Sequence, residues 1–118
     1  TVEEYNPGVI IEFKSNGVER RIPSNFEVSI FRLVQECVTN ALKHGKTKEI
    51  WVKIEWLKSA VNIVVKDNGV GFDRNVEKEK SFGLIGMRER VELLKGSMQI
   101  DSTIGKGTIM LFKIPLTV

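Results

Sequence analysis

The chain has 118 residues, of which 42% are hydrophobic and 28% charged, a size and composition typical of one domain with a single core. Its 18 basic and 15 acidic residues give a net charge of +3, without the concentrated basic stripe of a nucleic-acid-binding protein. The single cysteine, Cys37, excludes an internal disulfide, and no apolar run approaches the roughly 18 residues of a membrane-spanning helix. We expect one cytoplasmic domain over residues 1–118. Because it begins with Thr rather than Met, we expect it to be part of a longer protein.

The start of the chain predicts a β-hairpin. Residues 8–13, which include Val9, Ile10, Ile11 and Phe13, are expected to form a short strand, and residues 18–22 are expected to form a second one after the turn signal Ser15-Asn16-Gly17. Asn and Gly adopt positive φ at low cost, so this tripeptide is typical of a hairpin turn.

A long helix is predicted over residues 27–44, where apolar side chains recur at helical spacing. Ser24 or Asn25 is the expected N-terminal cap. Glu27 lies in the first turn, where the helix dipole favours a negatively charged carboxylate. Gly45 is the expected stop signal.

The remainder predicts four strands and a second helix. Apolar side chains at alternate positions indicate strands over residues 49–56 and 60–66. Two more strands are expected over residues 97–102 and 108–115, joined by a turn that contains Gly105 and Gly107. Residues 86–95 form an amphipathic helix that ends at Gly96, and the polar stretch 74–81 is interpreted as a lid or an exposed loop. The order ββαββ–lid–αββ, without an internal repeat, predicts one α+β domain.

Glu36 and Asn40 lie one turn apart on the predicted long helix, beside its apolar stripe. An amide oxygen can bind Mg²⁺, and a carboxylate can accept a proton or orient a nucleophile. Such residues are mostly solvated on helix surfaces, so the pair alone does not separate a site from an exposed face.

Three glycine-containing segments follow, and each also fits an ordinary turn or helix entry. Asp67-Asn68-Gly69-Val70-Gly71 comes directly after a strand, where bare backbone suits a flat ligand. Gly83-Leu84-Ile85-Gly86 opens the second helix, whose free N–H groups attract anions such as phosphate. Gly105-Lys106-Gly107-Thr108 is interpreted in the first place as a tight turn and in the second place as a ligand contact.

Two familiar nucleotide signatures do not fit. A Walker A loop would need Gly at position 100 and Ser or Thr after Lys106, where the chain has Ile100 and Gly107. A dinucleotide fingerprint beginning at Gly69 would need a third glycine where Arg74 stands.

The order and spacing of these segments resemble the N, G1, G2 and G3 boxes of the GHKL ATPases, which include DNA gyrase and the histidine kinases. The resemblance covers residues 27–116 and rests on Glu36-x-x-x-Asn40, Asp67-x-Gly69-x-Gly71, Gly83-x-x-Gly86 and Gly105-x-Gly107-Thr108. Residues 35–44 and 83–90 resemble the sensor histidine kinases that partner NarL-type response regulators. Cys37 stands where this family usually has a small residue, often Ala.

The resemblance implies the Bergerat fold, a two-layer α+β sandwich in which helices cover one face of a mixed, mostly antiparallel sheet. ATP would lie between the first long helix and the lid, with Asn40 binding Mg²⁺ and Glu36 acting as base or orienting the attacking group. Asp67 would accept a hydrogen bond from the adenine amino group. The other nucleotide-binding residues implied are Lys43 and His44 at the phosphates, Gly69 and Gly71 at the base, Gly83, Leu84 and Gly86 near the phosphates, and Thr108 supporting the adenine contact.

The resemblance implies the catalytic domain of a histidine kinase, which transfers the γ-phosphoryl of ATP to a histidine on dimerising helices outside this chain. His44 is the only histidine and ends the N-box helix, so it is not expected to be the acceptor. Implied partners are those helices and a NarL-type response regulator, with no direct nucleic-acid contact and a monomeric isolated domain. The alternatives are a stand-alone GHKL serine kinase of the anti-sigma-factor type and, more remotely, an RNA-binding KH domain.

Overall fold

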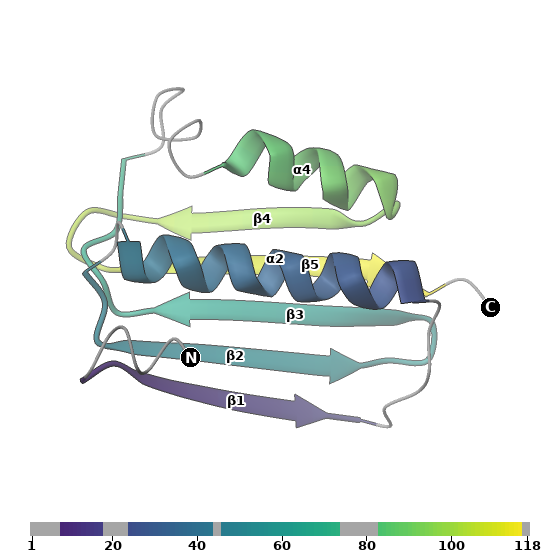
Figure 1. The fold of residues 1–118 in the computed structure, drawn as a ribbon, viewed down its shortest axis with the longest axis horizontal. Coiled ribbons are helices and arrows are strands. Elements are labelled where there is room, and N and C mark those ends of the chain that lie inside the picture. Colours follow the sequence, from purple (N-terminus) through teal and green to yellow (C-terminus); the bar gives the residue numbers. More distant parts are fainter. Residues whose placement is uncertain (1–7, 18–23, 44–45, 74–82, 117–118) are drawn as a thin grey trace.

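A computed structural model describes residues 8–17, 24–43, 46–73 and 83–116 (Figure 1). Its elements are β1 (Ile10–Asn16), α2 (Ser24–Lys43), β2 (Glu49–Trp56), β3 (Ala60–Asp67), α4 (Leu84–Leu93), β4 (Ser97–Ser102) and β5 (Thr108–Pro115). They form two layers, a five-stranded sheet and a pair of helices against one of its faces (Figure 1). The expected α+β architecture is confirmed.

The sheet has the strand order β1-β2-β3-β5-β4 and is mixed. β1 runs parallel to β2, whereas the β2–β3, β3–β5 and β5–β4 pairs are antiparallel. Parallel neighbours need a crossover connection, and α2 lies between β1 and β2 in the chain. The sheet is therefore mostly antiparallel, as expected.

The core lies between the helices and the inward face of the sheet. Ile63, near the middle of β3, pairs with Ile54 on one side and with Phe112 on the other. The helical contribution to the buried cluster is Ile30, Leu33, Cys37 and Ala41 from α2, and Leu84, Met87 and Val91 from α4. Each large apolar side chain in this cluster stabilises the fold by about 1.5–3 kcal/mol relative to an exposed one.

The N-terminal hairpin prediction is wrong where it can be compared with the structure. Ser15 and Asn16, expected in a turn, belong to β1 and pair with Ile54 and Glu55 of β2. Gly17 has a φ of 88°, so the chain does change direction directly after the strand. The predicted return strand, residues 18–22, and the predicted lid, residues 74–81, lie outside the described residues.

The helix boundaries differ slightly from those expected. α2 begins at Ser24 rather than Glu27, so the two candidate caps lie in its first turn. α4 spans Leu84–Leu93 rather than residues 86–95, and Lys95, two residues after its end, has a positive φ of 59°. Gly96 instead packs so closely on the backbone of Lys113 that a Cβ there would lie 2.6 Å from the carbonyl oxygen.

Candidate functional site

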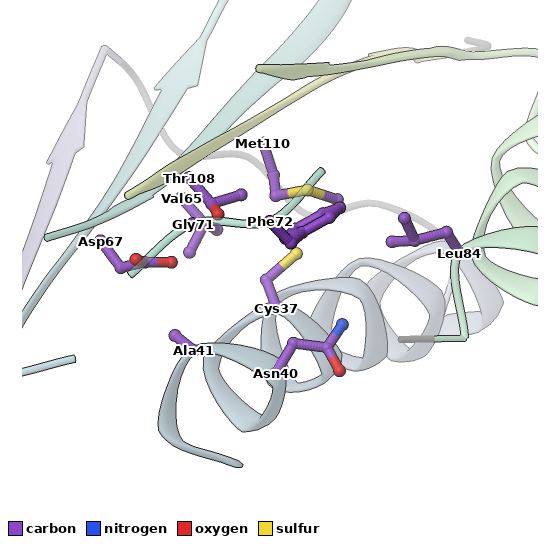
Figure 2. Close-up of a pocket in the computed structure, with 10 residues that line it drawn as sticks. All are labelled: Cys37, Asn40, Ala41, Val65, Asp67, Gly71, Phe72, Leu84, Thr108 and Met110. Atoms are coloured by element: carbon purple, nitrogen blue, oxygen red, sulfur yellow. The ribbon is translucent and has the colours of Figure 1, made fainter. Parts of the chain in front are cut away.

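A hollow opens between α2, the loop after β3, the start of β5 and the first residue of α4 (Figure 2). The space between its atoms is about 430 Å³ with open solvent included, but only about 20 Å³ of it can hold the centre of a water molecule, so the hollow is narrow. Its lining residues are Cys37, Asn40, Ala41, Val65, Asp67, Gly71, Phe72, Leu84, Thr108 and Met110. Five of the predicted site residues are in this set: Asn40, Asp67, Gly71, Leu84 and Thr108.

Asp67, the last residue of β3, places a buried carboxyl group in the wall of the hollow. Burial raises the pKa of Asp67, while hydrogen bonds from the backbone N–H groups of Gly69 and Thr108 act in the opposite direction. The Gly69 N–H donates to Oδ1 over 2.8 Å. A desolvated carboxyl group held by backbone donors is oriented to receive one further donor from a ligand.

Asn68, the next residue, ties this loop to the beginning of β2. Its Oδ1 accepts hydrogen bonds from Thr47 Oγ1 at 3.0 Å, from the Lys48 N–H at 3.1 Å and from the Glu49 N–H at 2.9 Å. Thr47 is 6% exposed, so the anchor is partly shielded from water. These bonds fix the backbone on which Asp67 stands.

Gly71 and Gly107 allow two loops to pack backbone against backbone beside Asp67. Gly71 has a φ of 67°, and a Cβ on it would collide with the carbonyl oxygen of Thr103. Gly107 has a φ of 79°, and its Cβ would collide with the carbonyl oxygen of Asp67. The G1 and G3 glycines therefore shape this end of the hollow, whatever contact they make with a ligand.

Ser102, which the sequence analysis did not single out, joins the same two loops. Its hydroxyl accepts a hydrogen bond from the Phe72 N–H at 2.9 Å. It also lies 2.8 Å from Thr108 Oγ1, which lines the hollow. Thr108 is thus held in place by β4 as well as by its pairing with Asp67 across the sheet.

The predicted site residues of α2 do not all line the hollow. Asn40 is half-buried and lines the hollow, its amide pointing toward the Leu84 side (Figure 2). Glu36, one turn earlier, is not part of the lining and instead accepts a hydrogen bond from Arg90 of α4 at 2.9 Å. Lys43 is exposed at the end of the helix, and His44 lies outside the described residues.

The G2 segment forms the start of α4. Gly83 precedes the helix with a φ of 67° and makes no side-chain cap, and Leu84, 1% exposed, closes one wall of the hollow. Gly83 and Gly86 are exposed and lie outside the lining. The first N–H groups of a helix have no partner within the helix, so this end presents donors and positive potential.

Several lining residues were not predicted, although a signal for them exists. Val65 and Met110 face the same way as Asp67 and Thr108 because side chains alternate along a strand. Cys37 is buried on α2, and its side chain lines the hollow (Figure 2). Burial raises the pKa of Cys37 far above its usual range, and the negative charges of Glu36 and Asp67 add to this, so the thiol stays protonated.

Comparison with known proteins decides the family. Residues 25–118 match the family described as "Histidine kinase-, DNA gyrase B-, and HSP90-like ATPase". The chain belongs to this family. It is an ATP-binding catalytic domain of the histidine-kinase type, and this membership removes the RNA-binding alternative.

Among curated relatives, the chain is 52% identical to the signal transduction histidine-protein kinase/phosphatase DegS of Bacillus subtilis, over 99% of this chain and 32% of that protein. It is 36% identical to the oxygen sensor histidine kinase NreB of Staphylococcus carnosus, over 97% of this chain and 33% of that protein. The chain therefore spans about a third of the length of these relatives.

Neither α2 nor α4 combines the length and apolar character needed to cross a bilayer.

Solved structures share the fold at lower identity. The histidine kinase domain of a blue-light-activated kinase from Erythrobacter litoralis has a TM-score of 0.81 at 22% identity, covering 98% of this chain and 59% of that one. The ATP-binding domain of PrrB from Mycobacterium tuberculosis has a TM-score of 0.70 at 19% identity, covering 99% and 87%. The expected two-layer kinase-type fold is confirmed.

Proposed function

We propose that this domain binds ATP in the hollow beside Asp67 and transfers the γ-phosphoryl group to a histidine supplied by phosphoacceptor helices outside the chain. The observation that carries the proposal is that the hollow combines apolar walls with two separate polar groups. The buried carboxyl group of Asp67 lies in one part of the hollow, and the amide of Asn40 lies toward Leu84 (Figure 2). A flat base would bind at the first group and the phosphates near the second.

Adenine fits the Asp67 end for reasons of hydrogen bonding. Its exocyclic amino group is a donor, whereas guanine presents a carbonyl oxygen at the equivalent position. A buried carboxylate accepts from the first and repels the second, and an unpaired buried group is costly. Gly69 and Gly71 would let the base approach the loop, while Thr108 would support the contact.

The phosphates would lie between Asn40 and the N-terminus of α4. Backbone N–H groups at Gly83, Leu84 and Gly86 would donate to phosphate oxygens, and Lys43 and His44 would add positive charge from the end of α2. The N-terminus of a helix of this length favours negative charge independently of any side chain.

The donor set suits Mg²⁺ that arrives with the nucleotide. Among the described residues there is no group of three or more His, Cys, Asp or Glu side chains able to hold a metal. Mg²⁺ commonly keeps several waters and binds through one or two protein oxygens together with phosphates. The amide oxygen of Asn40 would be the protein ligand, and the ion would neutralise phosphate charge during transfer.

Glu36 would orient the incoming imidazole or accept its proton, since it lies one turn from Asn40 on the same helix. We place the domain in the cytoplasm, where ATP and a NarL-type response regulator are available to the parent kinase. The protein would be a dimer through its phosphoacceptor helices, with this domain a separate unit.

The direct test is transfer of label from γ-labelled ATP with Mg²⁺. The domain alone should remain unlabelled, and the histidine-bearing helices of the parent kinase, added separately, should acquire acid-labile label. Acid-labile label on the domain alone that disappears in His44→Gln would contradict an external acceptor. Acid-stable label on serine of a partner would favour the serine-kinase alternative.

Asn40→Ala tests the phosphate end of the site. This variant should lose most Mg²⁺-dependent transfer, by about 100-fold, while nucleotide binding without Mg²⁺ changes much less. Thr39→Ala, an exposed neighbour on the same helix, is the matched control and should transfer normally. Normal transfer by Asn40→Ala would show that its amide does not hold the metal.

A further inference from the structure

Arg90 and Glu36 form an ion pair between the two helices that border the hollow. The Arg90 Nη1 donates to Glu36 Oε1 over 2.9 Å, and the two residues are 54 positions apart in the chain. Their side chains are 28% and 41% exposed respectively. The contact is therefore produced by packing of α4 beside α2 and not by local sequence.

The helix that supplies Arg90 also supplies a wall of the hollow. Leu84 at the start of α4 is 1% exposed and lines the hollow. Arg90 follows six residues later, about 9 Å along the helix axis at 1.5 Å per residue. A single helix thus contacts the nucleotide site at its beginning and the carboxylate of Glu36 near its end.

We propose that Arg90 is a positioning residue that fixes the carboxylate of Glu36 for the phosphoryl-transfer step. The ion pair engages Oε1 of Glu36. In this proposal Oε2 would receive the incoming imidazole. This inference rests on the proposed function, because it needs a nucleophile that arrives from outside the chain. A glutamate side chain has several rotatable bonds, and a charge-assisted hydrogen bond restricts it to one orientation.

A purely structural role for Arg90 makes a different prediction. Arg90 lies in the last turn of α4, where a cation interacts favourably with the helix dipole. Ion pairs this exposed contribute little to folding stability. Loss of a structural role would lower the unfolding midpoint, whereas loss of a positioning role would lower the transfer rate with ATP binding intact.

A double-mutant cycle in the full-length parent kinase separates these roles. The measurements are the transfer rate at saturating ATP, the dissociation constant of ATP and the unfolding midpoint. Arg90→Gln should slow transfer about tenfold, with ATP affinity and midpoint nearly unchanged. Glu36→Gln should slow it about 100-fold, and the double variant should be no slower than Glu36→Gln.

Two further variants serve as controls for the cycle. Arg90→Lys keeps one donor and the charge, so it should restore part of the lost rate. Arg88→Gln removes a charge from the same helix on the side that faces β4, and it should behave like the parent.

The outcomes are distinguishable. Any of three results would overturn the positioning role. They are full transfer by Arg90→Gln, equal slowing by Arg90→Gln in the presence and in the absence of Glu36, and a loss of transfer rate that weaker ATP binding explains. Normal transfer by Glu36→Gln would overturn it as well. Absence of transfer in the unaltered kinase, with ATP bound, would instead count against the proposed function.

Discussion

At the scale of single residues, Asp67 combines a cost to the fold with the role in nucleotide binding that we propose for it. It is 8% exposed, and the N–H donors of Gly69 and Thr108 offset only part of the loss of water. The raised pKa of Asp67 reflects that imbalance, and a ligand donor would relieve it. Perturbed carboxyl groups in a hollow are frequent in binding sites for this reason.

Asp67→Asn should weaken ATP binding by about 10- to 100-fold, because a charge-assisted hydrogen bond worth about 1.5–3 kcal/mol is lost. The free energy of unfolding of the empty domain at neutral pH should not fall, since a buried charge is removed. Calorimetry and denaturant unfolding of the same preparation measure both quantities. Unchanged affinity would remove Asp67 from the adenine contact.

The pH dependence of binding follows from the same group. Because burial raises the folded pKa of Asp67 above its unfolded value, this carboxyl group stabilises the fold fully below the unfolded pKa, and that contribution is lost as pH rises through the folded pKa. Binding runs the other way, because the adenine amino group needs the ionised acceptor. ATP affinity should therefore fall on acidification, with proton release on binding, and Asp67→Asn should lack this component. Subtracting the pH profile of Asp67→Asn from that of the unaltered domain cancels the contribution from titration of the nucleotide itself. Parallel pH profiles for the two would contradict the assignment.

At the scale of elements, the loops after β3 and before β5 are locked together by backbone packing. The Gly105 N–H donates to the Val70 carbonyl oxygen at 2.6 Å, and Gly71 leaves no room for a Cβ beside Thr103. This arrangement positions Asp67 and Thr108 at the ends of two paired strands.

Gly71→Ala should destabilise the domain by about 2–3 kcal/mol, because a positive φ and a backbone collision act together. Gly105→Ala is the matched control, with a φ of 85° but no atom within 4 Å of the added Cβ. It should cost only about 1 kcal/mol. Thermal or denaturant unfolding compares them, and equal losses would show that the collision is relieved by movement of the loop.

The elements also show what a sequence can predict. The predicted bounds of β2, β4 and β5 match the observed ones. In β2 the signal was the recurrence of apolar side chains at alternate positions, Ile50, Val52, Ile54 and Trp56, as expected of a half-buried strand. The Asn16-Gly17 turn signal led to a hairpin, but the partner of β1 is β2, more than 30 residues later, and local turn chemistry carries no information on such a pairing. Motif spacing predicted Asn40 and Asp67 as site residues, and the structure places both in the lining of the hollow. The pairing of Glu36 with Arg90 was not predicted, because it depends on how two helices pack.

At the scale of the whole molecule, the chain spans about a third of the length of DegS and NreB. Exposed large apolar side chains occur on different elements, including Phe13 on β1, Phe31 on α2 and Leu93 on α4. Scattered residues of this kind are normal for a monomer.

The isolated domain should therefore sediment as a monomer at micromolar concentration, with or without ATP. We propose that dimerisation belongs to the phosphoacceptor helices outside the chain. A stable dimer of this domain alone would place an assembly surface within residues 1–118, and the parent kinase with its helices is the positive control.

The central claim is that the hollow beside Asp67 is an adenine-specific nucleotide site that uses Mg²⁺ at its Asn40 end. Calorimetric titration of the unaltered domain with ATP and with GTP, each with and without Mg²⁺, tests it most directly. We predict saturable one-to-one ATP binding that Mg²⁺ strengthens, and GTP binding at least about tenfold weaker because guanine lacks the donor that Asp67 requires. Equal affinity for ATP and GTP, or no saturable binding of either, would contradict the account.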